Sequence, residues 1–407
     1  MMRDVKHEIL APVGDLERLY AAFDYGADAV YLGGTKFGMR AQAAKFDGEL
    51  LRLAVSEAHK RGKKVYLTCN TLPHNDEMPL LQGFCEEAQA AGVDAMITTD
   101  IGVLSLIKKY IPGMEIHIST QTGIVNYEAA RMFYELGAKR VVLARELSLE
   151  EIAEIRAKTP KELDIECFVH GAMCVSFSGR CLLSQYLIDR DANRGECAQP
   201  CRWGYYLMEE KRPGEYYPIF EDEKGSYILN AKDLCMIEHI DKLAEAGVYS
   251  FKLEGRAKST YYVSVVTNAY RMAMDIFEKD PEHFVLPQWI KDEVYKVSHR
   301  AYSTGFYFGS PRQGQYYENS GYIREYDVVA IVRECRDGRI YASQRNKFLK
   351  GDELEALIPG REPIVFKADI IYDENGEETE AANRATMDLS IASDLDLPEN
   401  TILRMKK

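Results

Sequence analysis

A short phrase recurs where predicted helices run into predicted strands, and this repeat constrains the fold more than any other feature of the sequence. It reads YGADAVYLGG from Tyr25, AGVDAMITTD from Ala91, LGAKRVVLAR from Leu136 and AGVYSFKLEG from Ala246. In each copy a glycine follows a helical run and precedes an apolar run, as in a left-handed helix C-cap. These glycines are Gly26, Gly92, Gly137 and Gly247. Any α/β fold contains such caps, but four similar units favour a (β/α)8 barrel over a doubly wound sheet.

Short apolar segments alternate with longer amphipathic ones over the first two thirds of the chain. The strand candidates are Glu8–Pro12, Ala29–Gly33, Lys64–Cys69, Ala95–Thr99, Glu115–Thr120, Arg140–Ala144, Asp164–Val169, Tyr227–Asn230 and Ser250–Leu253. Helical segments such as Leu16–Tyr25, Gly48–Arg61 and Leu80–Ala91 separate them. This alternation predicts βαβ units and a parallel sheet. Because these are nine candidates for eight barrel strands, we expect one to be peripheral or wrong.

From about Gly321 the pattern changes to short strands separated by turn residues. These candidates are Tyr326–Arg333, Arg339–Ser343, Pro363–Ile371 and Met387–Ile391. We therefore predict three parts. Residues 1–275 form the barrel, with a cysteine-bearing insertion at 172–225; residues 276–320 form a helical linker; and residues 321–407 form a small C-terminal β-domain, expected to be a barrel.

Composition narrows the class of protein. No apolar run is long enough for a transmembrane helix, and the first residues lack the apolar stretch of a secretory signal, so we expect a cytoplasmic protein. In a reducing compartment, nine cysteines indicate metal binding or redox chemistry more than disulfides. The net charge of −13 means that nucleic-acid binding would need a local cluster of Lys and Arg.

Four cysteines lie close together in the sequence. Cys174, Cys181, Cys197 and Cys201 have the spacing C-x6-C-x15-C-x3-C. Thiolates are soft ligands that hold iron–sulfur clusters or zinc. Structural zinc sites favour two closely spaced cysteine pairs, and only the last pair fits, so we favour a [4Fe–4S] cluster over zinc. The alternative is that several of these thiols are buried and inert.

The position of the four cysteines predicts where the cluster lies. The strand candidate Asp164–Val169 ends just before Cys174, and barrel active sites gather at the carboxyl ends of strands. Among the other cysteines, Cys235 follows a strand end and is the reserve ligand, which would replace Cys201. Cys69 ends a strand and would approach the same face, whereas Cys167, Cys85 and Cys335 are predicted to be structural.

The segment Glu166–Ser184, ECFVHGAMCVSFSGRCLLS, resembles the signature of the collagenase-like peptidase family U32. The opening LAPVGDLERLYAAFDYGADAVYLGG and the segments LNAKDLCMIEHI and FKLEGRAKSTYYVSVV extend the resemblance over most of Ile9–Ala273. A C-terminal β-domain is also typical of the long members. The resemblance therefore covers most of the chain.

This resemblance implies oxygen-independent hydroxylation more than proteolysis. One branch of the family serves 5-hydroxylation of the wobble uridine of tRNA, with prephenate implicated as the hydroxyl source; other branches modify a cytidine of ribosomal RNA or the ubiquinone ring. Such relatives carry a [4Fe–4S] cluster on four cysteines. The cysteine spacing, the length and the β-domain of this chain are similar to those of the tRNA branch, so we expect tRNA as its partner.

A dicarboxylate such as prephenate requires Arg or Lys side chains, because guanidinium pairs with carboxylate in a bidentate manner. The candidates at strand ends are Arg145, Arg256 and Lys252, with Arg180 in the signature. Each arginine also has a structural alternative, an ion pair with Glu146 or with Glu254. Glu254 itself completes the candidate catalytic set.

Two further kinds of side chain are predicted at strand ends. His170 directly precedes the cysteine region and would donate a proton or contact a cluster sulfide, although a lone histidine there is more often structural. Asn70, Gln121 and Asn230 carry amides that are able to read a base edge.

Two other functions stay open. A U32-type peptidase would need a nucleophile or a metal-bound water, and the sequence has neither an HExxH nor a GxSxG motif. Ser176, Ser178 and Ser184 lie near His170 in sequence, which says little about geometry. The third possibility is an iron–sulfur accessory subunit for rRNA or quinone hydroxylation, working with a second family member.

Overall fold

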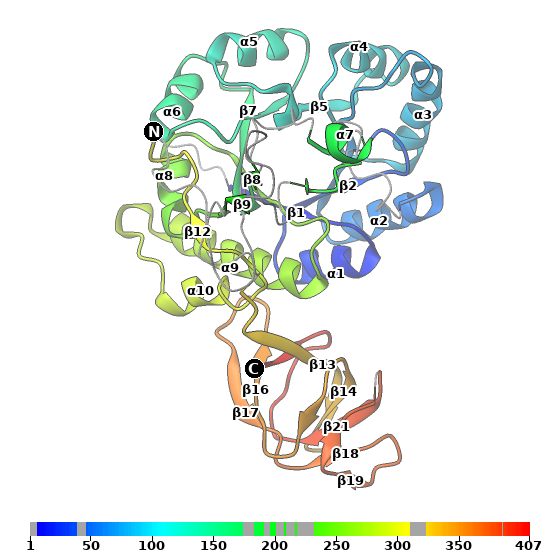
Figure 1. Ribbon diagram of the computed structural model, residues 1–407, viewed down its shortest axis with the longest axis vertical. Coiled ribbons are helices and arrows are strands. Elements are labelled where there is room, and N and C mark those ends of the chain that lie inside the picture. The colour runs from blue at the N-terminus through cyan, green and yellow to red at the C-terminus, as the bar shows by residue number, and fades with distance from the viewer. Residues whose placement is uncertain are drawn as a thin grey trace.

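The computed structural model describes residues 6–38, 46–173, 183–190, 196–200, 207–208, 216–217, 232–309, 323–384 and 386–407. A barrel surrounded by helices lies above a smaller β-domain in Figure 1, and the chain passes from one to the other once. The predicted strand Tyr227–Asn230 lies outside the described residues, as do Asn230 and Arg180.

Eight parallel strands close into a barrel, as the repeated phrase predicts. They are β1 (Glu8–Pro12), β2 (Ala29–Gly33), β3 (Lys64–Cys69), β4 (Ala95–Thr98), β5 (Glu115–Ile118), β6 (Arg140–Val142), β7 (Asp164–Ala172) and β11 (Ser250–Leu253). Each pairs with the next in this order, and β11 pairs with both β7 and β1 to close the ring. All eight correspond to strands predicted from the sequence, so the (β/α)8-like prediction is confirmed.

Helices cover the outside of the barrel, and their ends carry the signals expected from the sequence. The main ones are α1 (Leu16–Asp24), α2 (Gly48–Lys60), α3 (Leu81–Ala91), α4 (Ile101–Tyr110), α5 (Tyr127–Glu135), α6 (Leu149–Ala157), α8 (Ile240–Glu245), α9 (Thr260–Lys279) and α10 (Gln288–Glu293). Ser148 and Glu151 form a capping box at the start of α6. The predicted C-cap glycines have positive φ, for example 97° at Gly26 and 91° at Gly247.

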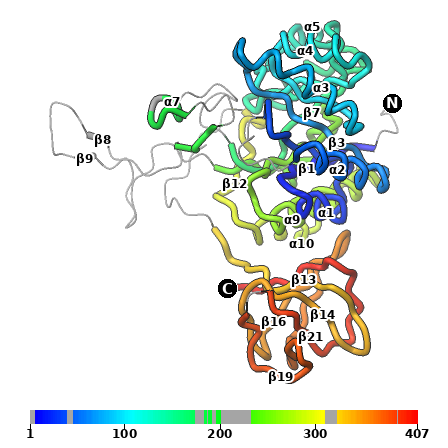
Figure 2. The backbone as a smooth tube through the Cα atoms, turned by 90° about the vertical axis from the view of Figure 1, so that its right-hand side faces the viewer, coloured from blue at the N-terminus to red at the C-terminus, as the bar shows by residue number. Residues whose placement is uncertain are grey.

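Two short strands extend the sheet beyond the ring. β10 (Asp233–Cys235) pairs antiparallel with the end of β7, and β12 (Tyr302–Ser303) runs parallel to β10. The short helix α7 (Leu183–Ile188) stands clear of the barrel wall: Figures 1 and 2 together place it in front of one barrel end. Two short strands, β8 (Leu207–Met208) and β9 (Tyr216–Tyr217), pair with each other.

The C-terminal β-domain is an antiparallel sheet with the strand order β17-β16-β22-β13-β14-β21-β18-β19. Its strands are β13 (Tyr326–Arg336), β14 (Arg339–Gln344), β16 (Glu353–Leu357), β17 (Ile364–Lys367), β18 (Ile371–Tyr372), β19 (Glu378–Thr379), β21 (Asp388–Ala392) and β22 (Ile402–Lys406). A separate pair joins β15 (Phe348–Leu349) and β20 (Ala381–Ala382). The sheet curves around its own apolar core as a half-barrel.

Buried polar contacts join the β-domain to the barrel. Arg404 of β22 is fully buried and lies 2.7 Å from Glu293 of α10 and 2.7 Å from Glu355 of β16. The Tyr25 hydroxyl donates to the Leu357 carbonyl at 2.9 Å. Because Leu357 and Ile402 also belong to the barrel's core cluster, the two parts share apolar packing as well as hydrogen bonds.

Within the described part of the chain, no helix combines the length and the apolar character needed to cross a bilayer.

Candidate active site at the barrel mouth

The interior of the barrel holds a network of buried charges below the mouth. Arg140 contacts Glu8 at 2.6 Å and Glu166 at 3.0 Å, and the Lys252 ammonium lies 2.6 Å from the other oxygen of Glu166. Tyr66 donates to Glu8 at 2.6 Å. All five side chains are buried. Since two cations meet two carboxylates, the network is balanced where water cannot screen it.

Burial and pairing act in opposite directions on these carboxyl groups. Burial alone would raise the pKa of Glu8, but Arg140 and the donated hydrogen bonds outweigh it and lower that pKa to about 2. Burial likewise acts to raise the pKa of Glu166, and Lys252 and Arg140 hold it below its ordinary value. Both carboxylates are therefore charged at neutral pH.

Aromatic rings cover this network on the mouth side. The Lys252 ammonium lies 4.4 Å from the Tyr31 ring centre and 5.4 Å from that of Phe168. The sequence suggested Lys252 as a clamp for a co-substrate carboxylate; the structure instead pairs it with Glu166 under the rings. Tyr31 and Phe168 thus separate the buried charges from the mouth.

The two predicted arginines lie above this floor. Arg145 donates to the Ala172 carbonyl at 2.8 Å, and its guanidinium lies 5.1 Å from the Phe168 ring centre. Arg256 reaches from the end of β11 to the Thr68 hydroxyl of β3, 3.4 Å away. Arg256 therefore extends across the barrel opening, where guanidinium groups are placed to meet an anion.

Glu254 lies at the same level as these arginines. Its carboxylate accepts a hydrogen bond from the Tyr31 hydroxyl at 3.2 Å, and its backbone N–H donates to the His170 carbonyl at 2.9 Å. The mouth thus brings Glu254 and Arg256 together over the Tyr31 ring. Their catalytic role stays a prediction.

His170 points away from the mouth, into an aromatic cage formed by Tyr262, Tyr270 and Tyr302. Its Nδ1 lies 3.4 Å from the Tyr270 hydroxyl and its Nε2 lies 3.3 Å from the Tyr302 hydroxyl. Burial lowers the pKa of His170 to about 3, so the ring is neutral at physiological pH. These surroundings favour the structural alternative over proton donation.

A set of uncharged polar side chains lines the mouth at the ends of β3, β4 and β5. Asn70 donates to the Ser119 hydroxyl at 3.4 Å, and the Thr99 hydroxyl lies 3.4 Å from the Gln121 side-chain oxygen. Asn70 and Gln121 were predicted at strand ends, and the structure brings them to one side of the opening. We call Asn70, Thr99, Ser119 and Gln121 the amide sector.

The structure shows which contacts several residues of the signature segment Glu166–Ser184 make. Glu166 belongs to the buried charge network and Phe168 to the mouth floor. Gly171 has a φ of 108°, and a Cβ there would collide with the Glu254 carbonyl. The Ser184 hydroxyl accepts from the Ala198 N–H at 3.2 Å and lies 4.0 Å from the Cys197 sulfur. Each of these positions therefore has a structural role in β7 or next to Cys197.

The predicted cluster ligands are only partly visible. Cys197 is exposed, next to the end of α7 that carries Ser184. Cys174, Cys181 and Cys201 lie outside the described residues. The donor set itself, four thiols beginning one residue after Met173 at the end of β7, has the chemistry that a [4Fe–4S] cluster needs. The ligand assignment therefore stays a prediction.

The other described cysteines differ in surroundings. Cys167 and Cys85 are buried in the barrel core, as predicted. Cys69 is buried on the helix side of β3, so it does not approach the mouth as the sequence suggested. Burial raises the pKa of Cys235 to about 11, which opposes the thiolate form that a metal ligand requires.

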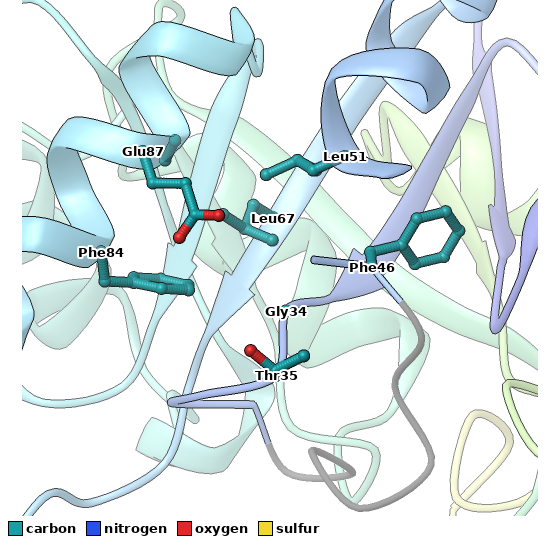
Figure 3. Close-up of a pocket in the computed structure, with 8 residues that line it drawn as sticks. Gly34, Thr35, Phe46, Leu51, Leu67, Phe84 and Glu87 are labelled. Atoms are coloured by element: carbon teal, nitrogen blue, oxygen red, sulfur yellow. The ribbon is translucent and has the colours of Figure 1, made fainter. Parts of the chain in front are cut away.

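A small hollow lies on the outer side of the barrel wall, between α2 and α3 (Figure 3). Leu51, Leu67, Phe84 and Phe46 surround it, and the Glu87 carboxylate points to its edge. None of the candidate site residues lines it.

Sequence reasoning missed Glu8, Arg140 and Tyr66. A signal was present, because Glu8 and Arg140 occupy strand positions from which an ordinary barrel strand would direct an aliphatic side chain inward. A charged residue near the end of a predicted strand is normally interpreted as exposed to solvent, and only knowledge of its partner shows that it is buried. Glu8 and Arg140 lie 132 residues apart in sequence.

Fold and site together define a two-domain (β/α)8-barrel protein with a polar, arginine-bearing mouth and a cysteine-rich segment after the seventh barrel strand. The family model of peptidase family U32 matches residues 14–316, and that of the U32 C-terminal domain matches residues 324–404. The chain belongs to peptidase family U32.

Curated relatives align over nearly the whole chain. The "tRNA hydroxylation protein P1" of Bacillus subtilis is 36% identical over 99% of this chain and 95% of its own length. The "tRNA hydroxylation protein P" of Escherichia coli is 35% identical over 98% of this chain and 97% of its own. The "23S rRNA 5-hydroxycytidine C2501 synthase" of Escherichia coli is 35% identical over 91% of this chain, but only 55% of that protein is covered.

A solved structure, that of the U32 peptidase Mk0906, aligns with 64% of this chain and 97% of its own at 14% identity, with a TM-score of 0.42.

Proposed function

We propose that this protein takes part in oxygen-independent hydroxylation of RNA, forming 5-hydroxyuridine at the wobble position of tRNA. The observation that carries the proposal is the full-length similarity to proteins named for tRNA hydroxylation, which includes the C-terminal domain. The similarity to an rRNA 5-hydroxycytidine synthase points to the same chemistry, hydroxylation of a pyrimidine in RNA.

The proposal includes a [4Fe–4S] cluster on Cys174, Cys181, Cys197 and Cys201. When bound, such a cluster would supply one-electron transfer. Position supports this assignment, because β7 ends at Ala172 and Arg145 bonds to that last carbonyl. The cysteine segment thus leaves the barrel beside Arg145, at the mouth rather than at the opposite end.

The residues of the mouth have distinct roles in this proposal. Arg145 and Arg256 bind the carboxylates of a dicarboxylate hydroxyl donor, for which prephenate is the candidate. Glu254 orients the Tyr31 hydroxyl and limits the opening on the β11 side. Tyr31 and Phe168 form an apolar floor that keeps water from the buried charges below. His170 maintains the shape of β7 from behind and moves no proton.

The test is nucleoside mass spectrometry of tRNA from a strain that lacks this gene and every redundant route to the same modification. Restoring the intact gene is expected to restore 5-hydroxyuridine and its derivatives. The variants Arg256→Met and Cys201→Ser are expected to leave them absent, while Arg61→Met, at a surface pair with Glu57, is expected to restore them. Unchanged tRNA after deletion would remove the assignment.

The family's printed description keeps proteolysis as the second candidate. His170, which precedes the signature serines in sequence, is buried with both ring nitrogens next to tyrosine hydroxyls, and this does not favour a role as the base that activates a nucleophile. Gelatin hydrolysis by iron-free protein, abolished by a single substitution, would favour the peptidase. Activity that appears only after a second family member is added would favour an accessory subunit.

A further inference from the structure

The amide sector occupies one continuous part of the barrel opening. Side chains alternate along a strand, so Asn70 follows the inward-facing Tyr66 and Thr68 on β3, and Ser119 follows the inward-facing His117 on β5. Thr99 lies between them, after β4. The sector therefore presents hydroxyl and amide groups from three adjacent strands toward the barrel axis.

The hydrogen bonds within this sector are long. Asn70 to Ser119, Thr99 to Gln121 and Thr99 to the Asn70 carbonyl are each 3.4 Å. This distance is at the outer limit of hydrogen bonding, where the interaction is weak. A ligand with its own donors and acceptors can therefore replace these contacts at little cost.

Exposed apolar side chains occur in the segments that follow the same three strands. Ile101 is 61% exposed, Leu80 50%, Leu72 44% and Val125 39%, and all four belong to the loops or helix starts that follow β3, β4 and β5. Exposed apolar side chains in segments that follow the strands of a polar site suit a ligand with an apolar face and a polar edge.

A pyrimidine base has this combination. Its flat faces pack against aliphatic or aromatic side chains, and its edge alternates donors and acceptors that Asn and Gln amides match in a bidentate manner. Enzymes that act on a base turn it out of its stack into such a pocket. The charged groups Arg145, Arg256 and Glu254 project from the ends of other strands, where a co-substrate or the RNA backbone would meet them.

We propose that the amide sector is the seat of one pyrimidine base turned out of an RNA strand, with Gln121 and Asn70 reading its Watson–Crick edge. This inference rests on the proposed function and specifies which residues would position the base so that one of its carbon atoms is hydroxylated. The Gln121 amide accepts from uracil N3–H and donates to a ring carbonyl, while Asn70 binds the next group along the edge.

The order of the strands gives this placement a chemical consequence. In the closed ring of eight, β11 is four strands from β4, the middle strand of the amide sector, so the carboxyl end of β11 lies across the opening from the sector. The C5–C6 edge of a pyrimidine is opposite its N3 edge. A base held by Asn70 and Gln121 therefore directs its C5–C6 edge toward the end of β11, where Glu254 and Arg256 lie.

The test uses volume-conserving variants of the full-length protein in the deletion strain. Gln121→Met and Asn70→Leu remove the amides and keep the side-chain size, and Gln121→Glu replaces the donor with a second acceptor. We expect the rate at which 5-hydroxyuridine appears after induction to fall about tenfold to hundredfold, as for the loss of a bidentate base contact. The matched control is Gln82→Met on the exposed face of α3, where the amide donates to Glu86 at 2.9 Å and the rate should be unchanged.

Two further measurements separate a base-reading role from a folding role. The melting temperature of each purified variant should remain near that of the unaltered protein, and its affinity for unmodified tRNA should change by less than about threefold, because phosphate contacts dominate affinity. Normal 5-hydroxyuridine formation by Gln121→Met and Asn70→Leu would overturn the base seat and leave the proposed function intact. Failure of the unaltered gene to restore 5-hydroxyuridine would contradict both the base seat and the proposed function.

Discussion

The most informative stability test concerns Glu8, at the first position of the barrel. The change is Glu8→Gln, which keeps the side-chain shape and removes the charge that faces Arg140 at 2.6 Å. The pKa of Glu8 is lowered from 4.5 to about 2 in the folded protein, against the effect of burial. At about 1.4 kcal/mol for each pKa unit, this shift corresponds to roughly 3 kcal/mol of folding free energy at neutral pH.

The pH dependence has a defined sign. Because the folded pKa is below the unfolded one, the charged Glu8 stabilises the protein fully above pH 4.5, and the contribution is lost as the pH falls toward 2. The difference between the original protein and Glu8→Gln should therefore be about 3 kcal/mol at pH 7 and roughly half of that or less at pH 3.

Urea unfolding followed by circular dichroism at both pH values measures this difference. Glu57→Gln is the control, because the pKa of Glu57 is also lowered, but by Lys60 and Arg61 on the protein surface, where solvent screens the charges. It should change stability little. A Glu8→Gln protein as stable as the original at pH 7, or a difference that does not shrink in acid, would refute the balanced-network account.

Three other perturbations test separate parts of the structure. Gly171→Ala should lower the melting temperature measured by calorimetry, because the residue needs φ of 108° and has no room for a Cβ; an unchanged melting temperature would contradict this. Arg404→Met should cost about 3 kcal/mol, because the buried carboxylates of Glu293 and Glu355 then keep only Lys296 as a cation, and it should make the β-domain more susceptible to limited proteolysis than the barrel. The His170 ring, with its pKa near 3, should show no titration by NMR between pH 8 and pH 5, and a midpoint near 6.5 would show that the cage is open.

Local signals explain which parts of the fold the sequence could predict. Helix C-cap glycines such as Gly92 and apolar strands such as Ala29–Gly33 are determined by residues close in sequence, so the barrel and its strands follow from pattern alone. In the C-terminal sheet, β16 and β22 were not predicted. Their paired residues are 45 or more positions apart in sequence, and the charged residues Glu355 and Arg404 interrupt their apolar pattern.

The location of a site residue was predictable when the residue directly follows a strand. Its surroundings were not predictable when they are formed by residues far away in sequence. Arg145, Arg256, Asn70 and Gln121 all lie at the mouth, because the end of a parallel strand determines where the following residues go. The surroundings of His170 were not predictable, since the tyrosine at Nδ1 lies 100 residues away and the one at Nε2 lies 132 residues away.

The central claim is that four cysteines after β7 hold a [4Fe–4S] cluster at the barrel mouth. Its most direct test is the iron and acid-labile sulfide content of protein purified without oxygen, together with its visible absorption. We expect about four iron and four sulfide per chain, lost in Cys174→Ser, Cys181→Ser, Cys197→Ser and Cys201→Ser and retained in Cys235→Ser. Colourless, metal-free protein, or a cluster that only Cys235→Ser removes, would contradict the account.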